Sequence, residues 1–481
     1  MKVLIIYCRF GDSTHITDFY SRVPLGIAYL GGVLRKEKFD VVLRDGIFYK
    51  NWEQFKEDLK QINPDVVGLS FTSSLKEYAI KYVKITKEVI PKTTIVAGGP
   101  HPTVCPEETI KELGIDFVVC SEGEKTFPEL LNSIKNKSVK SVKGIAYRNG
   151  EKIKVNPSRE MIQNLDEIPW PARDLLPMEK YLKMASLMPM PYPNTNILVS
   201  KGCPGNCLFC QPVLRKLTGH KVRYRSVENV IKEVKFLIDR YKIKSFDIGV
   251  DESTYDKEWI MKFCNSLLRE KINIKWGLAS RVDTVDEEML KKMGKAGCVY
   301  LSYGIESGSQ KMMNILRKGT KIEQAENALR WTEKAGICGR ANLMIGSPGE
   351  TWETIYETIE FIKRAKPDLI FIAGTVPLYG TDLYNLAEKE NMLVETKEDV
   401  TDYDFGHLKI DGLSNEDLRN GLNKIVKAYK KNLFDPRLFL RKKHIYINIF
   451  KYFLSLLGNR KELSRIFFHY ASYGKHIKTK N

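Results

Sequence analysis

Three cysteines close together in the chain carry its strongest chemical signal. Cys203, Cys207 and Cys210 form a C-x3-C-x2-C array directly after the apolar run 196–199, which predicts a short buried strand. The proline and glycine between the first two cysteines favour a loop that can fold around a metal centre. Three thiolates without a fourth Cys or His close in sequence fit an iron–sulfur cluster with one open iron. Structural zinc is the alternative, and it would need a fourth donor from elsewhere in the fold.

The array, with the aromatic Phe209 just before its last cysteine, resembles the cluster loop of the radical S-adenosylmethionine (SAM) enzymes. In that family the cysteines hold a [4Fe–4S] cluster, and its open iron binds the amino and carboxylate groups of SAM. Reductive cleavage of SAM then yields a 5'-deoxyadenosyl radical. The resemblance therefore implies that Cys203, Cys207 and Cys210 are the metal ligands and the catalytic centre.

Length and composition predict a protein of two or three domains. The chain has 481 residues, of which 43% are hydrophobic and 28% charged, as in soluble globular proteins. No run of about 18 apolar residues occurs, so no transmembrane helix is expected. The nine cysteines are odd in number and scattered outside the array, which disfavours a disulfide framework. A reducing, cytoplasmic location is expected.

The net charge of +18 indicates either an anionic partner or a general abundance of lysine. No RNA-binding module is evident, so nucleic acid is not expected as a partner. The basic stretch 437–457 alternates cationic residues with Phe, Leu and Ile. Such a stretch predicts either an amphipathic helix lying on an anionic membrane or a helix packed on the preceding domain.

Residues 1–137 alternate short apolar runs with amphipathic helical patterns. The predicted strands are 3–7, 40–43, 66–70, 94–97 and 117–120, and the predicted helices lie near 26–37, 52–61, 75–90, 107–113 and 126–134. Repeated βα units predict a parallel, doubly wound (Rossmann-like) sheet. Ligands of such sheets bind beyond the carboxyl ends of the strands, where the loops 70–74, 98–103 and 121–124 offer hydroxyl and backbone N–H groups.

This order of motifs, with residues 24–30 before the second strand, resembles the cobalamin-binding domain that precedes many radical SAM domains. The D-x-H-x-x-G motif of many cobalamin proteins is missing at 45–50, so the lower axial ligand of cobalt is not expected from that loop. Two alternatives are a domain that binds another nucleotide and one that binds nothing. His101 is expected in a loop near the nucleotide tail, or facing solvent. The cofactor-binding residues that the resemblance implies are Leu25, Ser70, Thr72, Ser73, Gly98, Gly99, Pro100, His101, Glu122 and Gly123.

Residues 138–185 form a predicted linker, with a hairpin turning at 149–150 and an extended proline-rich segment at 168–175. From 186 to 390 predicted strands and helices alternate again. The six predicted strands lie near 196–200, 245–250, 274–279, 299–304, 341–346 and 368–372. Six units predict a partial (β/α)6 barrel whose chemistry lies at the carboxyl ends of its strands. Residues 391–481 complete the predicted α/β protein as a helical, basic C-terminal region.

The candidate SAM-binding residues follow successive barrel strands. SAM requires acids for its amine and ribose, a cation for its carboxylate and apolar contacts for adenine. The resemblance implies Asp251 or Glu252 for the amine, Arg281 for the carboxylate and Glu306 for the ribose. It also implies Phe209 and Ile345 for the adenine, with Gly346 beside them. An ordinary solvated carboxylate is the alternative for each acid. The remaining cysteines of the barrel, Cys264, Cys298 and Cys338, are expected in its core.

Together these features resemble the cobalamin-dependent (class B) radical SAM methylases. The resemblance implies methyl transfer to an unactivated carbon of a small molecule or lipid, with a [4Fe–4S] cluster, SAM and cobalamin as cofactors. An electron donor such as ferredoxin or flavodoxin is the expected protein partner. Two alternatives remain: a cyclase or ring-rearranging enzyme that uses the same cofactors, and a non-enzymatic cobalamin or SAM sensor.

Overall fold

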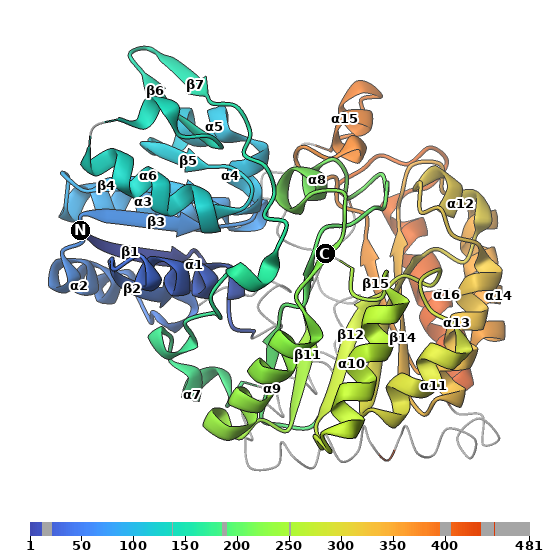
Figure 1. Cartoon of the computed structure of the whole chain (residues 1–481). Helices are drawn as coiled ribbons and strands as arrows, with labels where there is room; N and C mark the ends of the chain where they lie inside the picture. Colours follow the sequence, from blue (N-terminus) through green and yellow to red (C-terminus); the bar gives the residue numbers. More distant parts are fainter. Residues whose placement is uncertain are drawn as a thin grey trace.

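Two α/β units lie side by side in the protein, each built on one mostly or wholly parallel sheet (Figure 1). The computed structural model describes residues 1–11, 22–136, 138–184, 190–249, 252–394 and 406–433, together with residue 447. Asp251 therefore lies outside the described residues, and so does the predicted amphipathic stretch 437–457 except for residue 447. Among the described residues no helix is long and apolar enough to cross a membrane.

The N-terminal unit contains a seven-stranded sheet in the order β2-β1-β3-β4-β5-β6-β7. Its strands are β1 (Lys2–Tyr7), β2 (Asp40–Asp45), β3 (Val66–Ser70), β4 (Thr94–Gly98), β5 (Phe117–Val119), β6 (Ile145–Asn149) and β7 (Lys152–Val155). The first five are parallel, which confirms the predicted βα units. The hairpin predicted in the linker is present, but β6 pairs antiparallel with β5 and so extends the N-terminal sheet.

Helices cover both faces of this sheet, as a doubly wound fold requires. One face carries α1 (Leu25–Lys36) and α6 (Gly123–Lys135); the other carries α2 (Trp52–Ile62), α3 (Lys76–Val89) and α5 (Pro106–Leu113). Alternate residues of β1 divide between the two faces, because Val3 and Ile5 join one apolar core and Leu4 and Ile6 join the other. The short helix α4 (Pro100–Val104) follows β4 directly.

The second unit is a six-stranded parallel sheet in the order β15-β14-β13-β12-β11-β8. Its strands are β8 (Asn194–Ile197), β11 (Ser245–Ile248), β12 (Lys275–Ser280), β13 (Cys298–Glu306), β14 (Cys338–Ile345) and β15 (Leu369–Gly374). The first and last strands lie at opposite edges of this order, so the barrel is partial and open, as predicted. The outer helices are α9 (Val227–Tyr241), α10 (Lys257–Arg269), α11 (Glu287–Lys295), α12 (Gln310–Ile315), α13 (Ile322–Lys334) and α14 (Trp352–Ala365). Cys264, Cys298 and Cys338 are buried, as expected.

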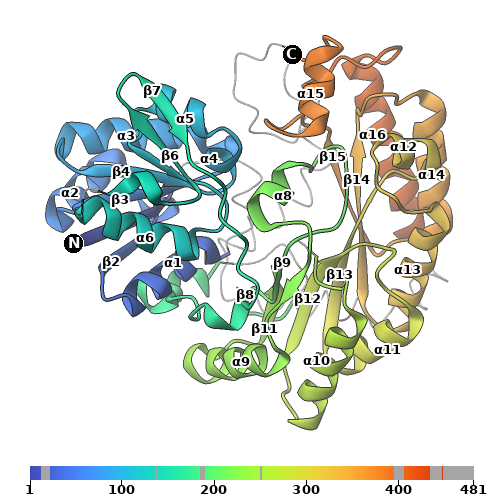
Figure 2. The same cartoon turned by 45° about the horizontal axis from the view of Figure 1, so that its top comes forward.

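The remaining elements connect and cover the barrel. They are α7 (Met178–Tyr181), β9 (Ser200–Lys201), α8 (Val213–Thr218), β10 (Arg223–Tyr224), α15 (Asp382–Lys389) and α16 (Asn415–Leu433). Short 3-10 turns occur at Gly46–Phe48, Ser73–Leu75, Val139–Ser141, Leu165–Glu167 and Arg173–Leu175. Helix α16 packs on α14, and α8 lies between the N-terminal unit and the barrel (Figures 1 and 2).

Candidate functional site

The cluster loop is held at both ends by backbone pairing. Strands β9 and β10 pair antiparallel on either side of it. The Cys203 N–H donates to the Gly219 carbonyl at 3.2 Å, and the Leu208 N–H donates to the Leu316 carbonyl at 2.9 Å. The three cysteines of the array lie in irregular backbone and turns between β9 and α8, as the proline and glycine predicted. The barrel therefore holds the backbone of the loop through these contacts.

A glycine between the first two cysteines of the array leaves space beside their sulfur atoms. A Cβ at Gly205 would come within 3.3 Å of the Cys203 Sγ and 3.8 Å of the Cys207 Sγ. A structural zinc ion would need a fourth protein donor in addition to the three thiolates. Three thiolates instead fit a cluster that leaves one iron open.

Arg281 lies against the cluster loop, with its Nη1 at 3.9 Å from the Cys207 Sγ. Its other donors are already used: Nε and Nη2 each donate to Asp283 at 2.8 Å, and Nη2 also donates to the Lys318 carbonyl. The positive charge of Arg281 faces Cys207, one of the cluster cysteines. The assignment of Arg281 to the SAM carboxylate stays a prediction.

A buried ion pair, Glu306 with Lys318, completes this side of the site. The Lys318 Nζ lies 2.9 Å from the Glu306 Oε1, and both side chains are at most 10% exposed. Glu306 has a φ of +72° beside a register shift in β13, a conformation that costs a non-glycine residue free energy. Lys318 also lies 6.0 Å from the centre of the Phe209 ring. No pattern in the sequence distinguishes Lys318 from the other lysines, so sequence reasoning missed it.

Glu252 is buried at the carboxyl side of β11. Its Oε1 accepts hydrogen bonds from the Thr254 N–H at 3.1 Å and the Thr254 hydroxyl at 3.0 Å. Burial raises the pKa of Glu252, while these two bonds act in the opposite direction. Burial likewise raises the pKa of Cys203, so a metal must displace a proton from this thiol. Of the two acids predicted for the SAM amine, Glu252 is the one that the structure describes.

The turn after β14 contains an acid that sequence reasoning missed. Ile345 is buried at the end of the strand, and Gly346 follows it with a φ of +82°. The Glu350 Oε2 accepts hydrogen bonds from the Gly346 N–H at 2.6 Å and the Ser347 N–H at 3.3 Å. Burial raises the pKa of Glu350 to about 7. Its only signal in the sequence is its place directly after the Gly-Ser-Pro-Gly turn.

A cavity of about 320 Å³ lies at the carboxyl ends of the N-terminal strands, where a doubly wound sheet binds its ligand. Ser70, Gly98, Gly99, Pro100, Glu122 and Gly123 line it, together with residues of α1, α6 and α8. The other predicted residues, Leu25, Thr72, Ser73 and His101, are not among those lining it. His101 in particular is neither in a loop nor facing solvent, because it lies in α4 and is 1% exposed.

The cavity has the glycine-lined wall that an elongated cofactor needs. A Cβ atom built on Gly98 would approach no atom closer than 3.6 Å, and one on Gly68 none closer than 3.5 Å. At these distances a Cβ would be in ordinary van der Waals contact, so each glycine takes up less of the cavity than any other residue would. This wall and the apolar side chains of α1 and α8 fit the nucleotide tail of cobalamin.

Buried ion pairs join the cavity to the cluster loop. The Arg223 Nη2 lies 3.0 Å from the Glu122 Oε1, and the Ile162 N–H donates to the Glu122 Oε2 at 2.7 Å. Lys201 pairs with Glu124 and lies 3.5 Å from Glu122. Glu122 thus lines the cavity, as predicted for a cofactor residue, but both of its oxygens already have protein partners. Its main structural effect is to fix β9 and β10 to the N-terminal unit.

The comparisons with known proteins agree with this two-cofactor arrangement. The model of the radical SAM superfamily matches residues 197–362, and that of the B12 binding domain matches residues 19–131. The uncharacterized methyltransferase PH0819 of Pyrococcus horikoshii is 36% identical over 77% of this chain and 80% of its own length. The anaerobic magnesium-protoporphyrin IX monomethyl ester cyclase of Rubrivivax gelatinosus is 29% identical over 75% of this chain and 65% of its own length.

Among solved structures, the radical SAM methyltransferase TsrM of Kitasatospora setae, with cobalamin and a [4Fe-4S] cluster bound, superposes with a TM-score of 0.70. The superposition covers 91% of each chain at 15% identity, and so it supports the fold. The two family models, the PH0819 relative and the cysteine array supply the family. The chain belongs to the radical SAM superfamily and carries a B12-binding domain, and its cofactors are a [4Fe–4S] cluster, SAM and cobalamin.

Proposed function

We propose that this enzyme transfers a methyl group, by way of cobalamin, to an unactivated carbon of a small molecule or lipid. One observation carries the proposal: the cavity of the B12-binding domain is walled by α8, which begins three residues after Cys210. The two cofactor sites therefore share one helix at the interface of the two units (Figure 2). The PH0819 relative, named as a methyltransferase, supports the same reaction class.

The chain's own residues have distinct parts in this proposal. Cys203, Cys207 and Cys210 hold the cluster, and Arg281 lies beside them. Glu252 receives the amine of SAM and Glu306, oriented by Lys318, receives the ribose. Phe209 contacts the adenine, together with the backbone at Ile345 and Gly346. When bound, the cluster and SAM supply a 5'-deoxyadenosyl radical, and cobalamin supplies the methyl group.

The substrate would occupy the inner side of the barrel. Ala341, Leu343 and Ile345 of β14 face the helix-covered core, so the alternate residues Arg340 and Asn342 face inward. The Asn342 Nδ2 and the Arg340 Nε both donate to the Ser302 hydroxyl, at 2.8 and 3.1 Å. The buried Asn342 Oδ1 has no hydrogen-bond partner among the described residues. This polar floor suits a substrate with a hydrogen-bonding group at its inner end.

Cyclisation without methyl transfer is the second candidate. It is favoured by the similarity to the relative named as an anaerobic cyclase. The two reactions share the cluster and SAM, and they differ in whether the methyl group of SAM reaches the corrinoid. Contact with a membrane, through the basic stretch near the C-terminus, would fit a lipid substrate in either case.

The deciding experiment follows the methyl group of SAM and needs no known substrate. The full chain is reconstituted without oxygen with iron, sulfide and hydroxocobalamin, then incubated with methyl-labelled SAM and a reductant. We expect about one cobalamin per chain, formation of 5'-deoxyadenosine, and label in the corrinoid fraction. A Cys203→Ala variant should lose the 5'-deoxyadenosine and keep the cobalamin. A chain that retains no cobalamin contradicts the proposal, and 5'-deoxyadenosine without labelled corrinoid favours the cyclase.

A further inference from the structure

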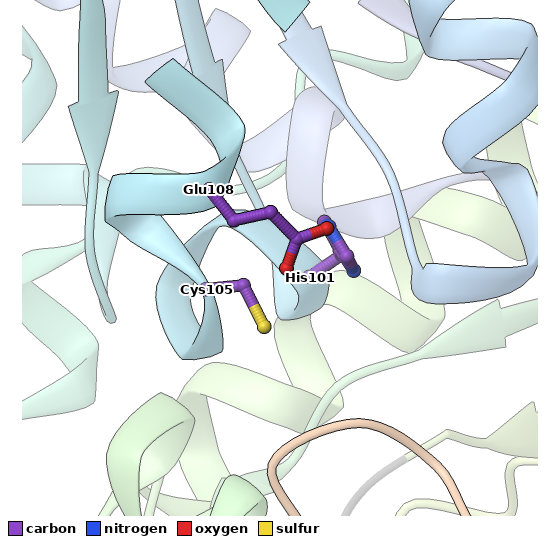
Figure 3. A group of neighbouring side chains, drawn as sticks. All are labelled: His101, Cys105 and Glu108. Atoms are coloured by element: carbon purple, nitrogen blue, oxygen red, sulfur yellow. The ribbon is translucent and has the colours of Figure 1, made fainter. Parts of the chain in front are cut away.

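Three side chains of ligand-forming types converge where α4 meets α5, outside the cluster and SAM site (Figure 3). His101 comes from α4, Cys105 is the residue between the helices, and Glu108 lies in the first turn of α5. One potential ligand atom of each lies within 4.8 Å of those of the other two. The spacing of four and three residues brings them to one side of the helical segment.

The His101 ring is held in the orientation that a metal ligand needs. Its Nδ1 is 3.1 Å from the Ser73 hydroxyl, and its ring stacks on Phe71 with the centroids 5.6 Å apart. With Nδ1–H donating to Ser73, the lone pair is on Nε2, which lies 3.8 Å from the Glu108 Oε1. Such a hydrogen bond from the other ring nitrogen commonly fixes a metal-binding histidine. Burial also lowers the pKa of His101.

The same His101 Nε2 has no hydrogen-bond partner among the described residues, although the side chain is 1% exposed. Its nearest acidic atom is the Glu108 Oε1 at 3.8 Å, which is too far for a hydrogen bond. Two ligands on one tetrahedral ion with bonds of about 2.1 Å would lie about 3.4 Å apart. The separation is therefore close to that of two ligands of one ion, and a bound ion would satisfy the nitrogen.

Lys76 is the competitor for this position, because its ammonium contacts the Glu108 Oε1. It also pairs with the Glu112 Oε2 at 3.0 Å, and this second bond lets Lys76 stay in place while Glu108 turns an oxygen toward an ion. The Cys105 thiol would release its proton to solvent on binding, as metal-bound thiols do. Nitrogen, sulfur and oxygen donors together suit a borderline-soft ion and exclude magnesium and calcium as preferred occupants.

We propose that His101, Cys105 and Glu108 bind one divalent transition metal ion, Zn²⁺ by the nature of the donors, at a site separate from the iron–sulfur cluster. The site would join α4 to α5 beside the cofactor cavity, because Gly99 and Pro100, directly before His101, line that cavity. Helix α4 also packs on α8. The ion would thus stiffen the wall that faces the cluster loop, and its presence does not depend on which reaction the enzyme performs.

The test uses the untagged full-length chain with Cys203, Cys207 and Cys210 replaced by alanine, so that the cluster ligands cannot bind the probe. Titration with Co²⁺ alone, without oxygen, should give one equivalent bound, with thiolate-to-cobalt absorption in the near ultraviolet and tetrahedral bands in the visible. Zn²⁺ should displace it. Cys105→Ser should remove the near-ultraviolet band, and Ser73→Ala should weaken binding about 10- to 100-fold.

Cys120→Ser is the matched control, because Cys120 is another half-buried thiol of the same unit, and it should leave the titration unchanged. Circular dichroism and metal-free thermal unfolding establish that each variant is folded. His101→Gln should also lose the bound ion, and if this variant does not fold, Cys105→Ser and Ser73→Ala still decide the matter. Absence of thiolate-to-cobalt absorption in the parent chain, or its persistence in Cys105→Ser, would overturn the proposal.

Discussion

Lys318 contacts several of the side chains that lie beside the cluster cysteines. Its ammonium pairs with Glu306, and its carbonyl accepts a hydrogen bond from Arg281 at 2.8 Å. The same ammonium lies over the Phe209 ring. An ammonium this deeply buried is held only by its partners, because desolvation otherwise opposes its charge. Lys318 therefore fixes one proposed SAM ligand, and its backbone positions the arginine beside Cys207.

Replacing Lys318 by methionine should destabilise the barrel by about 3–5 kcal/mol, because it leaves the Glu306 carboxylate buried without its partner. Urea unfolding followed by tryptophan fluorescence measures this loss, since Trp259, Trp276, Trp331 and Trp352 lie in the barrel. The double variant Lys318→Met with Glu306→Gln should recover most of the stability and still bind SAM more weakly. Lys311→Met, at an exposed lysine, is the control. Equal stabilities of the Lys318 and Lys311 variants would contradict the buried pair.

Glu350 should make the stability of the barrel depend on pH near neutrality. Its pKa is about 7 in the folded chain and near 4.5 in an unfolded one. Between these values the folded state holds a proton that the unfolded state has released, so stability falls as pH rises from about 4.5 to 7. Glu350→Gln removes this titration. Its stability relative to the parent should therefore increase from pH 5 to pH 8, by up to about 3 kcal/mol.

The measurement is urea unfolding of the cluster-free chain at several pH values, with Glu353→Gln at an exposed position as the control. The amide oxygen that Glu350→Gln introduces can still accept the hydrogen bonds from Gly346 and Ser347, so the fold of the turn is retained. Parallel pH profiles for the parent and Glu350→Gln would show that this carboxyl does not titrate near neutrality.

The residues that the sequence made predictable are those whose signal is local. Cys203, Cys207 and Cys210 fall within eight positions, so their spacing alone indicates a metal site. Lys318 acts on Glu306 from twelve positions away, across the connection from β13 through α12, and no periodicity records that contact. The burial of His101 was missed for a similar reason, because its partners Ser73 and Phe71 belong to the neighbouring strand's loop.

At the scale of elements, β3 and β4 form the wall on which the cofactor tail is expected to lie. Gly98→Val should fill this space, since valine is favoured in a strand and a Cβ at this position meets no atom closer than 3.6 Å. We expect the free energy of unfolding to change by no more than about 0.5–1 kcal/mol. The amount of cobalamin that the purified chain retains should fall at least tenfold. Cluster absorbance should stay the same. Thr94→Val, at the far end of β4, is the control.

Retention of cobalamin by the Gly98→Val variant would place the cofactor elsewhere.

The strands themselves were predictable, because each alternates with a helix of clear amphipathic period. The sequence of a hairpin does not indicate which other strand the hairpin will pair with. Residues 145–155 show the turn at Asn149 and Gly150, but only the antiparallel pairing of β6 with Phe117–Val119 of β5 makes the hairpin part of the sheet.

At the scale of the whole molecule, α8 is the element that lies between the two units. The Glu122–Arg223 and Glu124–Lys201 pairs fix its flanking strands to the B12-binding unit. The sequence could predict both units and their order, because each shows its own alternation of strand and helix patterns. It could not predict which loop would lie between them, since that depends on pairs such as Glu122 with Arg223, separated by 101 positions.

The net charge of +18 leads to a prediction about the expected protein partner. An acidic electron donor such as flavodoxin or ferredoxin would be drawn to a basic enzyme over long distances, and such steering raises association rates about 10-fold or more at low salt. Raising the salt from about 0.05 to 0.5 M shortens the Debye length to a few ångströms. Reduction of the cluster by flavodoxin should then slow at least about tenfold, as followed by stopped-flow absorbance under subsaturating donor.

Dithionite serves as the control, because a small reductant gains little from the summed field of the protein and its rate should change far less over the same salt range. The comparison separates an effect on docking from an effect on the cluster itself, since both reductants act on the same iron centre. If the rate of cluster reduction by flavodoxin does not depend on salt, the positive charge does not serve to attract the donor. It would then have another role, such as contact with an anionic membrane. In that case the charge would act near the basic stretch 437–457, and liposome binding would carry the salt dependence instead.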